Sequence, residues 1–205
     1  MSTVTERAQK AKVDKFAARR SELADAALSA IADGGFARTG LRDIAARVGL
    51  SHGVLHYYFR DKDDLIAHAV WQYKSECARR YDPVVATATT ASELADGFAA
   101  EMASTLQDDA DMHRLWYDLR TQAMYEEGFR DTIVAIDALL TDMVWTVLRR
   151  YADLAGREIA IERDEAYALV DGAFLNALIA FLRGDLDSPA RLQGTAARLL
   201  AAVLR

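Results

Sequence analysis

Two groups of side chains have the types and spacing for metal chemistry, and each matches a known pattern only in part. His52 and His56 lie four residues apart, so a helix would place both imidazoles on one face, as a metal site requires. No Glu stands between them as in a His-Glu-x-x-His site, and no third ligand is evident. Asp108, Asp109 and Asp111 resemble the acidic clusters that hold magnesium in some all-helical synthases, yet they fall where one predicted helix ends and the next begins. We therefore expect a solvated helix boundary, with no metal site, no cofactor and no catalytic residue.

The elements that carry the two histidines form a helix-turn-helix pattern within residues 39–62. The first helix has one apolar stripe at the spacing i, i+3, i+4 and i+7, made by Leu41, Ile44, Ala45 and Val48. Gly49 can adopt a left-handed turn without the steric cost of a Cβ, and Ser51 can cap the next helix through its hydroxyl. The pattern predicts two short helices that cross at the small residue Ala45.

The second helix of this pair turns polar and small side chains outward, whereas Leu50, Leu55, Tyr58 and Phe59 face inward. The outward set consists of His52, Gly53, Val54, His56 and Tyr57. A plain helical hairpin is the alternative, because many small helical domains contain one. Basic residues that bracket the pair favour a phosphate partner: Arg42, Arg47, Arg60 and Lys62. A helix with such a face can enter the major groove of DNA.

The same residues resemble the DNA-binding domain of the TetR family of bacterial transcriptional repressors, over about residues 16–65. The resemblance rests on the segments DGGF at 33–36, RDIA at 42–45, VGLS at 48–51 and YYF at 57–59, followed by Lys62 and Leu65. It implies DNA contacts by Thr39, Arg42, Ser51, His52, Gly53, Val54, His56, Tyr57, Tyr58 and Lys62. Gly40 stands where the family usually has Ser or Thr, so the expected phosphate contact moves to Thr39. His56 replaces a common Tyr, and the base preference does not transfer.

Charge is distributed unevenly along the 205 residues, whose formal net charge is −6. Residues 1–62 hold 11 Lys and Arg against 7 Asp and Glu, whereas residues 63–205 hold 14 against 24. A polyanion would be attracted to the first part and repelled by the second. Residues 1–15 are basic and lack apolar periodicity, which predicts a flexible basic arm. This arm is either a solvated tail or a segment that reaches along the DNA backbone or into a minor groove.

The rest of the chain reads as consecutive helices without an alternating strand pattern, which predicts an all-α protein. We expect a helix-turn-helix domain at 16–62 and a helical effector-binding and dimerisation domain at 63–205. Predicted helices begin at Asp61 and at Ser92 and continue at 114–126, 130–153, 163–183 and 189–204. The apolar run 177–182 is far shorter than the roughly 20 residues of a bilayer span, and no signal peptide is recognised, so we expect a cytoplasmic protein. The single cysteine, Cys77, is expected to be a small buried apolar residue.

The last two predicted helices are more apolar than one core contact requires. Residues 166–182 are apolar on nearly every side, and the final helix carries a matching stripe. Two such helices from each of two chains would form a four-helix interface, as in TetR-like proteins, and a two-fold axis would match paired operator half-sites. The expected interface residues are Phe174, Leu178, Phe181, Leu192 and Leu199. Burial within a larger monomeric core is the alternative.

The middle helices collect aromatic and sulfur-containing residues that suit a ligand cavity as well as an ordinary core. We expect a cavity lined by Phe98, Met102, Trp116, Met143, Trp145 and Asn176. Asn176 is a lone amide in the most apolar helix, and it needs either a ligand or a hydrogen bond to a neighbouring helix or across a dimer axis. The segments LWY at 115–117, DGA at 171–173 and RGDL at 183–186 are similar to the subgroup typified by the choline-responsive repressor BetI. Aromatic side chains can bind a quaternary ammonium, but they suit many apolar effectors equally.

Together these patterns predict a homodimeric DNA-binding transcriptional regulator that a small-molecule effector releases from double-stranded operator DNA. The sequence also allows two other functions. One is a ligand-independent helical DNA-binding protein. The other, which the patterns favour less, is an all-helical metal-dependent enzyme that uses Asp108, Asp109 and Asp111.

Overall fold

The computed structural model describes residues 4–34 and 40–205, and within them the chain is all-α, as predicted. A single bridge between Ile159 and Leu204 is the only extended pairing in these residues. The chain divides into two compact units. The N-terminal unit comprises Met1–Tyr73 and Asp118–Thr132, and the C-terminal unit comprises Lys74–Tyr117 and Ile133–Arg205.

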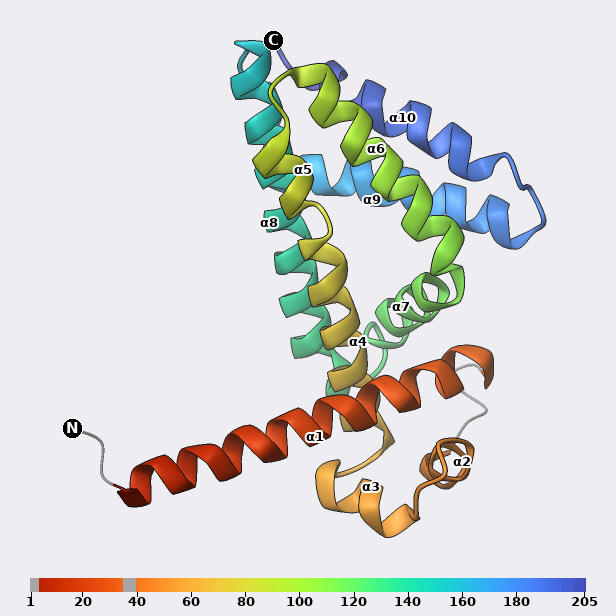
Figure 1. Cartoon of the computed structure of the whole chain (residues 1–205). Helices are drawn as coiled ribbons and strands as arrows, with labels where there is room; N and C mark the ends of the chain where they lie inside the picture. Colours follow the sequence, from red (N-terminus) through yellow and green to blue (C-terminus); the bar gives the residue numbers. More distant parts are fainter. Residues whose placement is uncertain (1–3, 35–39) are drawn as a thin grey trace. The chain divides into compact units, whose positions relative to one another are not determined.

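The N-terminal unit is built on the helix-turn-helix that the sequence predicts (Figure 1). Its helices are α1 (Val4–Gly34), α2 (Leu41–Arg47), α3 (His52–Tyr58) and the first part of α4 (Lys62–Arg79). The end of α7 (Ala110–Gln122), the 3-10 helix η2 (Glu127–Phe129) and the start of α8 (Arg130–Ala155) complete the unit.

Local signals fix the two short helices. The Gly40 N–H donates to Asp43 Oδ2 at 2.9 Å, which starts α2. Gly49 has a φ of 69°, the left-handed conformation that a glycine adopts most easily. The N–H of Val54 donates to the Ser51 hydroxyl at 3.3 Å, so Ser51 caps α3 as predicted.

The core of the N-terminal unit draws on α1 to α4 and on the 118–132 segment. It includes Leu23, Ala24, Ala27, Leu28, Ile44, Ala45, Leu55, Phe59, Leu65, Ile66, Ala69, Val70, Tyr73, Leu119, Ala123 and Phe129. Arg20 on α1 donates to Asp64 on α4 at 2.8 Å and lies over the Phe59 ring at 5.0 Å from its centroid. These contacts give the exposed residues of α3 a packed base.

The first residues differ from the flexible arm that the sequence predicted. Within residues 1–15, the described part from Val4 onward belongs to α1. Its Ala, Lys, Arg and Gln residues have high helix propensity, and the helix continues from the packed part of α1 without a break. The predicted boundary at residue 62 coincides with the start of α4, whereas the compact unit extends to Tyr73.

The C-terminal unit is a bundle in which α6 packs against α9 and α10, and α10 packs against α9 (Figure 1). Its further helices are α5 (Asp82–Thr87), α6 (Ala91–Asp108), α9 (Arg163–Leu182) and α10 (Ser188–Ala202). The sequence predicted that α6 begins at Ser92 with Ser92 as its cap, whereas the helix begins at Ala91. Thr90 caps this helix, because its hydroxyl accepts from the Glu93 N–H at 3.2 Å while Glu93 accepts from the Thr90 N–H at 3.3 Å.

Candidate functional site

Helix α3 exposes a compact polar face opposite its buried residue Leu55. Tyr57 is 70% exposed and Val54 37% exposed, and Gly53 and His56 are exposed beside them. The His52 and His56 rings meet edge to face with centroids 4.3 Å apart. These side chains can therefore reach a partner together.

The aromatic residues at the end of α3 are held by helix α1. Phe16 stacks on Tyr58 at 4.9 Å between centroids and meets the edge of Tyr57 at 5.8 Å. Tyr58 is half-buried by this contact, whereas the Tyr57 ring stays in solvent. The arrangement fixes two phenol rings beside the outward face of α3.

Cationic side chains surround this face. Arg42, Arg47 and Arg60 are exposed, and Lys62 is half-buried at the start of α4. Partial burial, followed by the nearby His56 and Arg42, lowers the pKa of His52, which keeps this imidazole neutral at pH 7. Thr39, the remaining predicted contact, lies outside the described residues.

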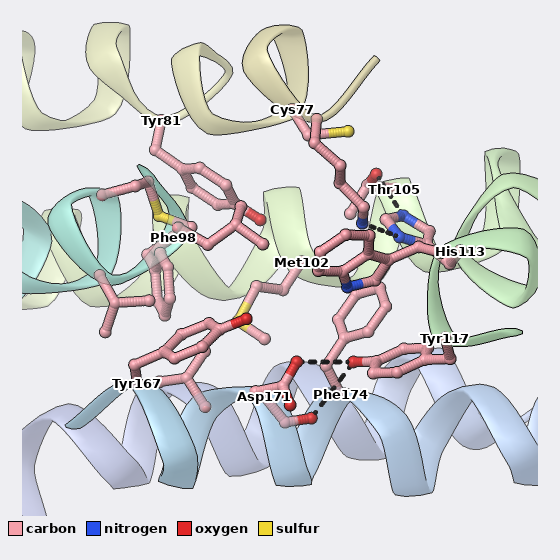
Figure 2. Close-up of a pocket in the computed structure, with 16 residues that line it drawn as sticks. Cys77, Tyr81, Phe98, Met102, Thr105, His113, Tyr117, Tyr167, Asp171 and Phe174 are labelled. Atoms are coloured by element: carbon pink, nitrogen blue, oxygen red, sulfur yellow. Dashed lines mark hydrogen bonds between the residues drawn. The ribbon is translucent and has the colours of Figure 1, made fainter. Parts of the chain in front are cut away.

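A cavity of about 70 Å³ lies within the C-terminal unit, between α4, α6, α7, α8 and α9. Its wall contains four of the six predicted ligand-binding residues, Phe98, Met102, Trp116 and Met143. Figure 2 shows Tyr81, Phe98 and Tyr167 on one side of Met102, with His113 and Tyr117 on the other. The cavity thus has an aromatic end and a more polar end.

The other two predicted lining residues lie elsewhere, which corrects the expectation for both. Trp145 is half-buried and packs against the core without reaching the cavity wall. Asn176 is exposed on α9, because five residues after the wall residue Asp171 a helix has turned away by about 140°. The amide is therefore not a cavity group.

Polar wall residues that the sequence reading missed form a connected network. Lys74 and His113 are each 4% exposed, and Lys74 Nζ lies 3.1 Å from His113 Nδ1. A lysine ammonium can only donate, so Nδ1 accepts, and Nε2–H donates to Thr105 Oγ1 at 3.0 Å. Arg80 also donates to this hydroxyl, at 2.7 Å, and forms an ion pair with Asp109 at 2.7 Å. The network joins α4, α6 and α7.

His113 is neutral in this network. Burial, followed by the charges of Lys74 and Arg80, lowers its pKa to about 2. Tyr81 also keeps its proton, because burial raises the pKa of its hydroxyl. The wall therefore offers the Lys74 ammonium and a neutral phenol as donors. On α9, the Asp171 carboxylate accepts from the Tyr117 hydroxyl at 2.9 Å.

A signal for the missed residues is present in the sequence. Lys74 stands four residues after Val70, three before Cys77 and seven before Tyr81, so it interrupts an apolar helical stripe. His113 likewise precedes Trp116 by three residues. A charged or polar residue on such a stripe predicts a buried polar group, which needs a partner.

Helix α9 presents an apolar face that the single chain does not cover. Leu169, Ile179 and Leu182 are 44%, 47% and 43% exposed, and Asn176 is exposed among them. By length and composition alone α9 could cross a membrane, with a mean hydropathy of 1.5 and 17% of that window buried in the chain. The sequence analysis considered only the apolar run 177–182, whereas the full length of α9 meets the length and composition of a bilayer span.

Three of the five predicted interface residues are instead buried in the chain's own core. Phe174 is 9% exposed, and Leu178 and Leu192 are 2% exposed. All three belong to the core cluster of the C-terminal unit, Phe174 and Leu178 from α9 and Leu192 from α10. Phe181 and Leu199 are half-buried.

The acidic cluster makes ordinary local contacts. Asp109 pairs with Arg80, Asp111 with Arg114 at 3.2 Å, and Asp108 accepts from the Ser104 hydroxyl at 2.8 Å. In the part of the chain that the structure describes, no group of three or more His, Cys, Asp or Glu side chains is arranged to hold a metal ion.

Comparisons with known proteins agree with this architecture. Residues 23–69 match the family described as bacterial regulatory proteins, tetR family. The HTH-type transcriptional regulator PksA of Bacillus subtilis is 26% identical over 181 residues, covering 82% of this chain and 83% of PksA. BetI of Burkholderia cenocepacia HI2424 is 29% identical over 180 residues, covering 85% of this chain and 89% of BetI. A TetR transcription regulator from Haloarcula marismortui has a similar structure, with a TM-score of 0.75 at 21% identity, covering 92% of this chain and 100% of that one.

A helix-turn-helix unit joined to a separate helical unit defines a DNA-binding regulator of transcription. The chain belongs to the TetR family of transcriptional regulators and is not an enzyme. The family predicted from the sequence is thereby confirmed.

Proposed function

We propose that this regulator is a homodimeric, cytoplasmic repressor, and that a small-molecule effector releases it from operator DNA by filling the cavity of the C-terminal unit. One observation carries the proposal. The wall of the cavity includes Lys74 and Cys77 of α4, and α4 begins at Lys62, four residues after α3 ends. One helix therefore takes part in both units.

The proposed DNA contacts fall into two groups. His52, Gly53, Val54 and His56 are nearest the bases, because they form the outward face of α3. The backbone contacts come from residues with hydroxyl or cationic groups that flank this face: Thr39, Arg42, Ser51, Tyr57, Tyr58 and Lys62. Gly53 leaves open space for DNA, since a Cβ at this position would meet nothing closer than the Ser51 hydroxyl at 4.0 Å.

The proposed dimer uses the exposed face of α9 with the adjacent half-buried residues Phe181 and Leu199. A second copy would cover Leu169, Ile179 and Leu182, and the hydrophobic effect would drive the association. Asn176 lies within that face, so its amide can pair with a group of the second chain. Two recognition helices related by a two-fold axis then match two operator half-sites.

Release follows from a shift in populations. An effector that binds more tightly to the conformation with poorly spaced recognition helices lowers the DNA affinity by the ratio of its two affinities. By linkage, operator DNA lowers the effector affinity by the same factor. A ligand-independent DNA-binding protein, the alternative function, would show neither effect.

Genomic footprinting of the purified full-length protein tests the proposal. We expect protection of a few palindromic sites upstream of genes, which would give the operator and the neighbouring genes whose products indicate the effector. Protection without sequence preference would contradict a repressor. Specific protection that no small molecule alters would support the ligand-independent alternative.

A further inference from the structure

The aromatic end of the cavity contains a buried tyrosine hydroxyl that can bind a ligand without giving up a bond to the protein. Resting on the proposed function, we propose that the effector is an uncharged, mainly apolar molecule whose carbonyl oxygen accepts a hydrogen bond from the Tyr81 hydroxyl. This assignment names the chemistry of the ligand and a residue that binds it, and family membership leaves both open.

Tyr81 stands between α4 and α5, and its side chain lines the cavity. It is 7% exposed, and its ring packs against Phe98 with centroids 5.2 Å apart. Figure 2 shows the ring extending from the end of α4 toward the interior of the cavity, with no hydrogen bond between its hydroxyl and the other wall residues drawn. Within the described residues, this hydroxyl is therefore a buried polar group directed into the cavity without a partner.

Other polar side chains of the wall are already hydrogen-bonded within the chain. Lys74, His113 and Thr105 are joined in one network, Tyr117 donates to Asp171, and Tyr167 donates to Asp137 at 2.7 Å. A ligand that used one of these groups would compete with its partner in the protein. A ligand that uses the Tyr81 hydroxyl meets no such competition.

The buried hydroxyl favours a ligand that accepts a hydrogen bond. Burial raises the pKa of Tyr81, so the phenol keeps its proton and can donate it. A buried polar group needs a hydrogen-bond partner, and water that enters a cavity can meet that need. An effector that fills the aromatic end displaces such water, so it must bring an acceptor of its own to avoid the cost of an unpaired hydroxyl.

The neighbours of Tyr81 in the wall disfavour a charged acceptor. Phe98, Met102 and Val144 line the same cavity and are 1%, 2% and 2% exposed. An ionised group among them would lose its water and gain little more than one phenol, which is unfavourable. A carbonyl brings an acceptor and no donor, so a single hydrogen bond satisfies both it and Tyr81. An alcohol would bring a second donor that these apolar side chains cannot accept.

The volume of the cavity favours a small apolar body. It measures about 70 Å³, which is less than the roughly 150 Å³ of a cavity that binds benzene. Met102 and Met143 belong to the wall, and methionine side chains adapt to ligands of different shape, so a single ring can be accommodated. Because Tyr81 directly follows α4, a ligand held by its hydroxyl acts on the end of the helix that takes part in both units.

The test is a calorimetric titration of the DNA-free full-length protein with five six-membered ring compounds. These are cyclohexanone, methylenecyclohexane, cyclohexanol, cyclohexanecarboxylate and the cyclohexylammonium ion. Methylenecyclohexane has the shape of the ketone without the acceptor. We expect cyclohexanone to bind at least about five-fold more tightly than the alcohol and the two ions.

Tyr81→Phe removes the hydroxyl and keeps the ring. This variant should weaken the binding of cyclohexanone about five-fold or more, because the carbonyl is then buried without a donor. The affinity for methylenecyclohexane should change by less than about two-fold, since this probe makes no hydrogen bond with Tyr81. The thermal midpoint of the ligand-free protein should not fall, because the lost hydroxyl has no partner in the fold.

Two other Tyr→Phe variants are matched controls. Tyr125→Phe removes a hydroxyl from a side chain that is 79% exposed in the N-terminal unit, and all affinities should stay as in the wild type. Tyr117→Phe removes a wall hydroxyl that is bonded to Asp171. It should lower the thermal midpoint and leave the ratio of the cyclohexanone and methylenecyclohexane affinities unchanged.

Several results would overturn the assignment. An equal effect of Tyr81→Phe on cyclohexanone and methylenecyclohexane would show that the hydroxyl does not bind the carbonyl. A clear fall in the thermal midpoint of ligand-free Tyr81→Phe would show that the hydroxyl has a partner in the fold. Failure of cyclohexanone to bind, or tighter binding of either ion, would also contradict it. If cyclohexanone binds through Tyr81 but leaves operator affinity unchanged, the carbonyl site stands and the proposed mechanism of release fails.

Discussion

The proposed DNA-facing surface and the cavity are built in opposite ways. The described residues of this proposed surface come from one short stretch, 42–62, and most of them lie on the two short helices α2 and α3 with their polar groups in solvent. The cavity takes its wall from five helices, between Lys74 and Phe174, and its polar groups are buried. Exposed groups can be replaced at little cost to folding, whereas buried groups contribute to stability and to binding at once.

This difference predicts where substitutions separate function from stability. At the DNA-facing surface, loss of binding should occur without loss of stability. In the cavity the two effects should be coupled, because the same side chains fill the core of the C-terminal unit.

The largest expected effect is that of Trp116→Ala. Trp116 is 1% exposed, and deletion of a buried tryptophan side chain costs about 3–5 kcal/mol of the free energy of unfolding. Tyr57→Ala removes an exposed ring of similar size and should change stability by less than about 0.5 kcal/mol while weakening operator binding. Thermal and urea denaturation measure the stability of both variants. Equal stability of the two variants would refute the contrast between the regions.

The next effect concerns the exposed face of α9. Ile179→Glu would place an uncompensated charge in the proposed dimer interface, and we expect a folded monomer with operator affinity reduced by a factor of ten or more. Val134→Glu, on an exposed apolar position of α8, serves as the matched control and should remain dimeric. Light scattering at micromolar protein concentration measures whether each variant is a monomer or a dimer. A dimeric Ile179→Glu protein would place the interface elsewhere.

A smaller effect should appear with pH. His113 has a pKa of about 2 in the folded protein against 6.5 in the unfolded chain, so the unfolded state binds the proton first as pH falls. Its contribution to stability is full above pH 6.5 and is lost progressively below it, by about 1.4 kcal/mol at pH 5.5. His113→Gln should reduce this acid sensitivity. Burial also lowers the pKa of His68 in the N-terminal unit, so its contribution to stability is likewise lost as the pH falls. Stability that rises on acidification would contradict a neutral buried His113.

The smallest effect is expected for Lys62→Ala. Loss of one phosphate contact should weaken specific and non-specific binding alike, and should reduce the magnitude of the slope of log K against log salt by about 1. Arg149→Ala removes an exposed cation of the C-terminal unit and should leave the slope unchanged. Fluorescence anisotropy at several salt concentrations gives both slopes. Identical slopes for the wild type and Lys62→Ala would show that Lys62 does not contact a DNA phosphate.

The two regions also differ in how far the sequence predicts them. Gly49 and Ser51 act within three residues of their own positions, so the helix-turn-helix follows from local chemistry. Lys74, His113 and Thr105 belong to three helices, and only the packed bundle brings them together. The spacing of apolar residues shows that α9 has an apolar stripe, but it does not show which neighbouring helix covers that stripe. Phe174 and Leu178 were therefore predicted in the dimer interface, although they lie in the core of the chain.

Cys77 allows the most direct test of coupling between the cavity and DNA binding. It is the only cysteine of the chain, it is 7% exposed, and it lines the cavity. Methyl methanethiosulfonate transfers a thiomethyl group to the thiol, forming a mixed disulfide and releasing methanesulfinate, and dithiothreitol reverses the reaction. Mass spectrometry confirms complete labelling, and Cys77→Ser treated in the same way is the control.

The measurement is the affinity for a footprinted operator before labelling, after labelling and after reduction. We expect the labelled protein to bind the operator about 5- to 150-fold more weakly, reduction to restore the affinity, and Cys77→Ser to be unaffected. A fully labelled, folded dimer with unchanged operator affinity would contradict the claim that occupancy of the cavity controls DNA binding.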